Sequence, residues 1–130
     1  MTRPIDLETA VAIGRDFVGQ IASGSQGKAS LTGEYPDAFV LDHLLAPYLG
    51  EESPPEEVRD FAAAAGVYLG LWLLRFWTRL GLPVFWVDGA IEACGPGARV
   101  PRPDGPPFSF TLRVPGHVMA MVASPPDPFP

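Results

Sequence analysis

The longest stretch of hydrophobic positions in the chain, Val58–Leu80, predicts a helix that is apolar on nearly every side. No charged residue occurs from Phe61 to Leu74. A helix of this kind either crosses a membrane or lies in a protein core, and the uncharged run is shorter than the roughly 20 apolar residues that a membrane span needs. We therefore predict a core helix, with Phe61–Leu80 shielded from water by the rest of the chain, and no membrane span.

Signals at both ends bound this helix. Ser53-Pro-Pro-Glu56 has the order of a capping box, in which Ser53 accepts a hydrogen bond from a helix amide and Glu56 reaches back to the amide of Ser53. At the other end, Gly81 can adopt a left-handed conformation, and Pro83 prevents the helix from continuing.

Two glycines, Gly66 and Gly70, lie inside the predicted helix. Each costs about 1 kcal/mol relative to alanine in a helix interior. The usual compensation is the close approach of another backbone, so we expect a second element to pack closely against these glycines.

Two further helices are predicted before the central one. In Asp6–Ser23 the apolar residues follow helical spacing, with Asp6 as the N-cap and Gly24 at the end. Pro36–Leu49 is rich in leucine and predicts a second helix, which Pro47 would end or kink. The first half of the chain is therefore expected to be helical.

After Gly81 the pattern changes to short runs that are typical of strands. Pro83–Val87 is rich in β-formers, and residues 88–89, Asp-Gly, favour a two-residue hairpin turn. Ala90–Cys94 would be the returning strand. These features predict an antiparallel strand pair.

The last third of the chain predicts a loop and two more strands. Gly95–Pro107 is dense in proline and glycine and indicates a loop. Phe108–Val114 alternates apolar and polar residues as a half-buried strand does. Residues 115–116 would turn the chain, and His117–Ala123 would be the final strand.

This order of elements predicts an α+β fold, with helices first and strands second. We expect three N-terminal helices whose central apolar helix packs on a three- to four-stranded C-terminal antiparallel sheet. The first two helices would cover the other side of the central helix. Residues 1–123 would form a single domain, followed by a proline-rich tail at residues 124–130.

Charge and cysteine content narrow the possible functions. The net charge of −6 argues against binding to nucleic acid or anionic membranes. The single cysteine excludes an internal disulfide and a multi-cysteine metal site. The sequence indicates no cofactor, metal site or catalytic residue, and the absence of a leader-like apolar segment near Met1 leads us to expect a cytoplasmic protein.

One group of side chains on the central helix is typical of a binding surface. Tyr68, Trp72, Arg75 and Arg79 follow helical spacing and form one stripe, and Tyr, Trp and Arg are enriched at interface hot spots. The stripe predicts a docking face for another protein or for a second copy. The other interpretation is that Tyr68 and Trp72 are core residues with polar tips at the edge, and that the arginines complement the helix dipole.

A second set of residues suggests a pocket between the central helix and the sheet. Trp86, Cys94 and His117, near Trp72, could line such a pocket and bind a small molecule. Cys94 with a histidine could act as a thiol nucleophile, but a lone cysteine is more often a small buried residue.

The segments LDHLLAPYL, AGVYLGLWLLRFW and PFSF carry a resemblance. Their order is similar to that in small bacterial domains of unknown function, in which a helix with a Tyr-Leu-Gly element precedes a short antiparallel sheet. The resemblance covers Leu41–Val114 and implies the order of the elements, and no active site. The sequence as a whole favours a non-enzymatic interaction protein of a bacterial cytosol, of an adaptor, accessory or immunity type. A small-molecule-binding domain or small enzyme is the alternative.

Overall fold

The computed structural model describes residues 4–24, 31–32, 37–46 and 56–123. Its elements, in chain order, are α1 (Leu7–Gly24), α2 (Asp37–Leu45), α3 (Glu56–Arg79), β1 (Val84–Val87), β2 (Gly95–Val100), β3 (Phe108–Thr111) and α4 (Val114–Ala123). The strands form one antiparallel sheet in the order β1-β2-β3. The predicted α+β class is therefore confirmed, whereas the helices are arranged differently, because a helix follows the sheet where a strand was expected.

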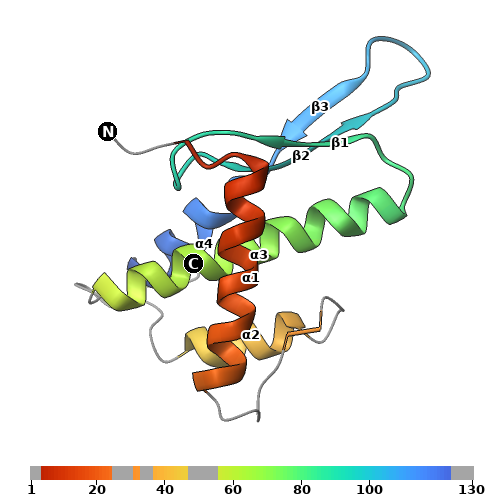
Figure 1. Cartoon of the computed structure of the whole chain (residues 1–130). Helices are drawn as coiled ribbons and strands as arrows, with labels where there is room; N and C mark the ends of the chain where they lie inside the picture. Colours follow the sequence, from red (N-terminus) through yellow and green to blue (C-terminus); the bar gives the residue numbers. More distant parts are fainter. Residues whose placement is uncertain (1–3, 25–30, 33–36, 47–55, 124–130) are drawn as a thin grey trace, which may run out of the picture.

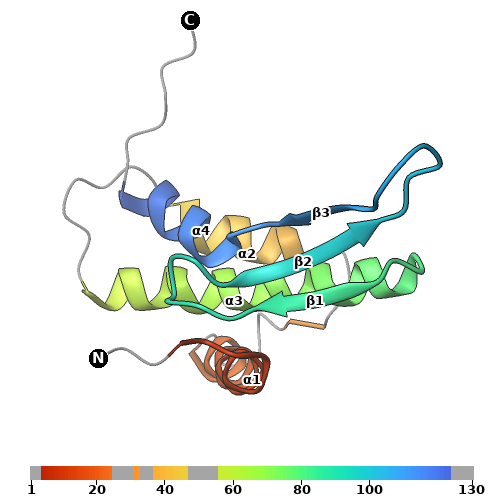
Figure 2. The same cartoon turned by 90° about the horizontal axis from the view of Figure 1, so that it is seen from above.

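Helix α3 lies at the centre of the molecule, with the other elements around it (Figure 1). Seen from above, α1 lies on one side of α3, α2 and α4 lie on the other, and the sheet passes over α3 (Figure 2). A core cluster joins α3 to the other three helices of the described residues. Its buried members are Phe17, Ile21, Leu31, Leu41, Ala62, Ala65, Val118 and Val122.

Two residues show that the C-terminal end of α3 is not shielded from water. Phe76 is 43% exposed and Leu80 is 61% exposed, so the prediction of a water-excluded helix over Phe61–Leu80 is wrong at this end. Among the described helices, α3 is long and apolar enough by composition to cross a membrane, with a mean hydropathy of 1.3 in its most apolar window. Core helices of soluble proteins meet the same criterion, so the expected absence of a span stays a prediction.

The glycines of α3 are positions where other elements approach closely. A Cβ added to Gly66 would overlap the backbone of Pro115 at the start of α4. A Cβ added to Gly70 would lie 3.2 Å from Cδ of Pro96 and 3.4 Å from the ring of Trp86. The predicted close approach of a second backbone is confirmed at Gly66, and the contact at Gly70 is with side chains of the sheet.

Two predicted helix ends are confirmed by local geometry. The backbone amide of Thr9 donates to Oδ1 of Asp6 at 2.8 Å, which makes Asp6 the N-cap of α1. Gly81 has a φ of 82°, the left-handed conformation expected after α3. Ser53, Pro47 and the tail at residues 124–130 lie outside the described residues.

The sheet contains a strand that the sequence did not predict. Strand β1 pairs with β2 so that Val87 lies opposite Gly95, and residues 88–94 form the loop between them. The amides of Ala93 and Cys94 both donate to the carbonyl of Ala90 at 2.9 Å. The predictions of a two-residue turn at residues 88–89 and of a returning strand at Ala90–Cys94 are therefore wrong. The second strand, β2, lies inside the segment Gly95–Pro107, which was predicted to be a loop.

The predicted final strand His117–Ala123 is also wrong, because this segment belongs to α4. The amide of His117 donates to the carbonyl of Arg113 at 3.0 Å, which closes the first turn of a helix. Proline is tolerated in a first turn because the amide it lacks has no helical partner there. Pro115, Val118 and Val122 are buried along one face of α4, and β3 accordingly ends at Thr111 instead of continuing to Val114.

Candidate functional site

The site begins where α1 crosses α3. Gly14 is buried at this crossing, and a Cβ added there would lie 3.0 Å from Cδ1 of Leu71. The start of α1 is held to the loop after β1 by Ile5, whose amide donates to the carbonyl of Gly89 at 2.6 Å. The indole N–H of Trp86 donates to the carbonyl of Ile5 at 2.9 Å. The crossing is thus fixed by close packing and by hydrogen bonds before the first turn of α1.

A groove of about 200 Å³ lies along one side of this crossing. The residues that line it are Val11, Gly14, Arg15 and Val18 of α1 and Tyr68, Leu71, Trp72 and Arg75 of α3. Its lining is mainly apolar, and Arg15 and Arg75 are both exposed. The structure therefore combines an apolar hollow with two cations in a chain whose net charge is −6.

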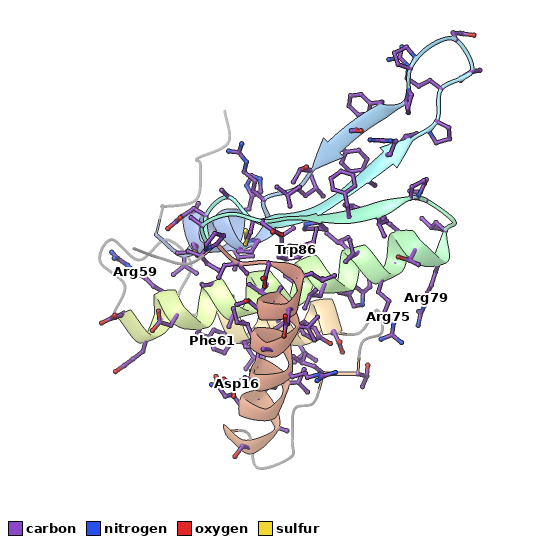
Figure 3. All side chains as sticks on the ribbon, turned by 45° about the horizontal axis from the view of Figure 1, so that its top comes forward. Asp16, Arg59, Phe61, Arg75, Arg79 and Trp86 are labelled. Atoms are coloured by element: carbon purple, nitrogen blue, oxygen red, sulfur yellow. The ribbon has the colours of Figure 1, made fainter. Side chains whose placement is uncertain are left out.

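Three of the four stripe residues predicted from the sequence, Tyr68, Trp72 and Arg75, line this groove. Arg79 does not line it and is exposed one turn further along α3. Arg75 and Arg79 lie on the same side of α1 (Figure 3). The sequence did not predict that α1 supplies the opposite wall, because its pattern cannot show where two helices cross.

Tyr68 forms a fixed wall of the groove. Its hydroxyl donates to Oδ2 of Asp37, which is the first residue of α2. Asp37 is only 2% exposed. Oδ1 of Asp37 accepts from the amide of Thr32 at 2.8 Å and from its hydroxyl at 3.1 Å. The ring centroid of Tyr68 lies 6.0 Å from that of Phe17. Tyr68 therefore contributes its ring to the groove while its polar tip is bound inside the protein.

Trp72 begins a row of apolar side chains that leaves the groove along α3. Its ring stacks on Phe76 with centroids 5.5 Å apart and an interplanar angle of 5°. We call Trp72, Phe76 and Leu80 the exposed ridge, since they follow one another at intervals of four residues and the last two are exposed. Sequence reasoning assigned Phe76 and Leu80 to the core, although their spacing from Trp72 was visible.

A second groove, of about 430 Å³, lies along α1 and the N-terminal half of α3. Its lining residues are Ile13, Asp16, Phe17, Gln20, Glu57, Asp60, Phe61 and Ala64. Asp16 and Phe61 lie on the opposite side of α1 from Arg75 and Arg79 (Figure 3). The side-chain amide of Gln20 donates to Oδ2 of Asp16 at 3.0 Å. The charged residues that line the two grooves therefore have opposite signs, basic in the first groove and acidic in the second.

The acidic residues of this second groove do not form a metal centre. Within residues 4–24, 31–32, 37–46 and 56–123, no group of three or more His, Cys, Asp or Glu is placed to hold a metal ion.

The three residues of the alternative pocket lie in different surroundings. The indole N–H of Trp86 is bound to Ile5, and Cys94 is fully buried with Sγ 3.7 Å from the carbonyl of Ile91. Burial raises the pKa of the Cys94 thiol, and the charge of Glu92 raises it further. His117 is exposed in the first turn of α4. None of the three lines either groove described above.

Comparison with protein-family models, with curated proteins and with solved structures finds no match to this chain. The fold and the site define a small α+β domain with an apolar groove between α1 and α3 that carries two arginines. The similarity to small bacterial domains stays a prediction from the sequence.

Proposed function

We propose that this chain is a non-enzymatic protein–protein interaction domain of a bacterial cytosol, of an adaptor, accessory or immunity type. The partner binds at the groove between α1 and α3. One observation carries this proposal: Trp72 and two arginines, Arg15 and Arg75, meet at a single apolar hollow. Trp and Arg are the residue types most enriched among the side chains that dominate binding energy, and such side chains cluster in pockets that exclude water.

The size of the groove supports a protein partner over a small-molecule ligand. Pockets for small molecules commonly measure about 300–1,000 Å³ and enclose most of the ligand. The groove measures about 200 Å³, which suits one or two side chains from a larger surface. The anchoring of Tyr68 by Asp37 favours binding as well, because a preformed wall needs no ordering when a partner arrives.

The alternative, a small-molecule-binding domain or small enzyme, receives less support from the geometry. The raised pKa of Cys94 favours the neutral thiol, which is a weak nucleophile. The indole N–H of Trp86 already has an acceptor inside the protein. We therefore do not assign a reaction to Trp86, Cys94 and His117.

Site-specific photo-crosslinking in the native host tests the proposal. A photoreactive amino acid replaces Arg75 in one variant and Arg59 in a matched control, since both arginines are exposed on α3 and lie at opposite ends of it (Figure 3). We expect a discrete crosslinked protein from position 75 that is absent from position 59. Equal crosslinking from both positions, or none from position 75, would contradict the proposal.

A further inference from the structure

The exposed ridge extends the groove into a longer binding surface. Trp72 lines the groove, Phe76 stacks on it, and Leu80 lies one turn beyond with 61% of its surface exposed. Residues four apart in a helix lie on the same face, and eight residues cover about 12 Å along the axis. The surface is therefore an apolar row about two helical turns long, with a hollow at one end.

This geometry is suited to a helical partner. Side chains spaced by four residues form a ridge that packs into the groove between two such rows of a facing helix. Recognition of an amphipathic helix uses anchors at such helical spacings. One apolar side chain of the partner would fill the groove beside Trp72 and Leu71, and the following turns would cover Phe76 and Leu80.

The charge around the groove specifies the partner further. The charged residues that line the groove are Arg15 on α1 and Arg75 on α3, and both are cations. Arg75 lies three residues after Trp72, so it lies beside the ridge and not within it. A partner that places carboxylates next to its apolar face would meet these arginines, whereas a basic partner would be repelled.

The same charges argue against a second copy of this chain as the occupant. A symmetric dimer brings identical patches together, so a patch must be complementary to itself. Here Arg15 and Arg75 of one copy would meet the same two cations of the other. The acidic residues Asp16, Glu57 and Asp60 line the other groove and would not enter this contact.

The geometry points to an amphipathic helix of another protein as the ligand, with an apolar face that is flanked by acidic residues. This helix lies along the exposed ridge and places one apolar side chain in the groove. The inference rests on the proposed function, since it names the kind of partner that the same site binds.

Three synthetic peptides of about 18 residues, or five helical turns, provide the test with the full-length protein. The first has leucines along one face and glutamates beside them. The second has lysines in place of the glutamates. The third has the composition of the first in an order that removes the apolar face. Binding is measured by fluorescence anisotropy of the labelled peptide, and light scattering reports the oligomeric state of the protein.

We expect the glutamate peptide to bind a monomeric protein about tenfold more tightly than the lysine peptide, because each arginine contact at a surface contributes modestly. It should also bind more tightly than the scrambled peptide, because that peptide has no apolar face to cover the exposed ridge. Replacing both arginines, Arg15→Glu and Arg75→Glu, should reverse the preference between glutamate and lysine. Arg59→Glu, the control, should leave it unchanged, and circular dichroism verifies that each variant is folded.

Equal binding of the glutamate and lysine peptides would overturn the inference, as would equal binding of the scrambled peptide. A protein that dimerises through Arg75 would also overturn it. If the photoreactive group at position 75 crosslinks a partner while the glutamate peptide fails to bind, the proposed function stands and the inference fails. If position 75 captures no partner and the peptide fails as well, both are overturned.

Discussion

The hydroxyl of Tyr68 donates a hydrogen bond to the buried carboxyl group of Asp37, so a wall of the groove is anchored at the start of α2. The same carboxyl group accepts two hydrogen bonds from Thr32. A segment before α2, the first turn of α2 and the middle of α3 are thereby joined at one buried group. The shape of the groove consequently depends on a contact outside it.

Replacing Tyr68 with phenylalanine removes this donor and keeps the ring in the groove. Loss of a hydrogen bond to a buried acceptor costs about 1–3 kcal/mol, so we expect Tyr68→Phe to lower the free energy of unfolding by that amount. Urea denaturation measures the change. An unfolding free energy equal to that of the natural protein would show that the Tyr68–Asp37 contact does not support the fold.

Alanine at Gly66 should be strongly unfavourable, because the added Cβ would overlap the backbone of Pro115. Overpacking in a close-packed region costs about 1–3 kcal/mol, and this cost exceeds the gain in helix propensity. Gly19 is the matched control, since a Cβ there meets nothing within 4 Å. Gly19→Ala should instead stabilise the protein by about 0.5–1 kcal/mol. Thermal denaturation of the two variants should give shifts of opposite sign, and a shared sign would contradict the packing of α3 against α4.

The N-cap of α1 should make stability depend on pH. Hydrogen bonds from the side chain and backbone of Thr9 lower the pKa of Asp6 below its ordinary value of 3.8. Since the pKa of Asp6 is lowered in the folded protein, the contribution of Asp6 to stability is fully present above pH 3.8. It is lost as the pH falls through the folded pKa. Asp6→Asn keeps a side-chain oxygen that can accept the hydrogen bond, but asparagine does not titrate in this pH range. The difference in melting temperature between the natural protein and Asp6→Asn should therefore shrink on acidification, and a difference that is constant with pH would contradict this account.

Cys94 should be unreactive while the protein is folded. Its side chain is fully buried, and burial raises the pKa of the thiol, so the reactive thiolate is both inaccessible and disfavoured. A chromogenic disulfide reagent at pH 8 should label Cys94 only after denaturant is added. Rapid labelling of the folded protein would reopen the alternative of a thiol nucleophile.

Because the folded thiol has the higher pKa, the unfolded chain releases its proton first as the pH rises. The contribution of Cys94 to stability is therefore present below the unfolded pKa and declines above it. Cys94→Ala should show a weaker loss of stability between neutral and alkaline pH than the natural protein. A larger loss in the alanine variant would contradict the direction of the shift.

The helices α1 and α3 could be predicted from the sequence because their signals are local. Asp6 and Gly81 determine helix ends through contacts within a few residues of themselves. Strand β2 could not be predicted, since Gly95 and Gly97 are poor strand residues by propensity. They are required by tertiary packing, because a Cβ at Gly97 would overlap the ring of Phe85 and one at Gly95 would overlap the carbonyl of Leu112.

The segment at residues 114–123 was wrongly predicted because its apolar residues fit more than one period. The apolar run Val118–Val122 is consistent with a strand. The same segment places Pro115, Val118 and Val122 on one face of a helix. Packing against Gly66 selects the helix. For the site, the sequence indicated the α3 stripe and its residue types, but the wall from α1 and the exposure of Phe76 depend on how distant segments meet.

The most direct test of the docking groove uses the partner that photo-crosslinking at position 75 identifies. The measurement is the affinity of this purified partner for two charge-reversal variants on α3. Arg75→Glu should raise the dissociation constant about tenfold or more, because a rim cation becomes an anion. Arg59→Glu makes the same change of charge at the other end of the helix and should leave the dissociation constant within about twofold. Equal effects of the two variants, with both proteins folded, would contradict the assignment of the groove between α1 and α3 as the binding site.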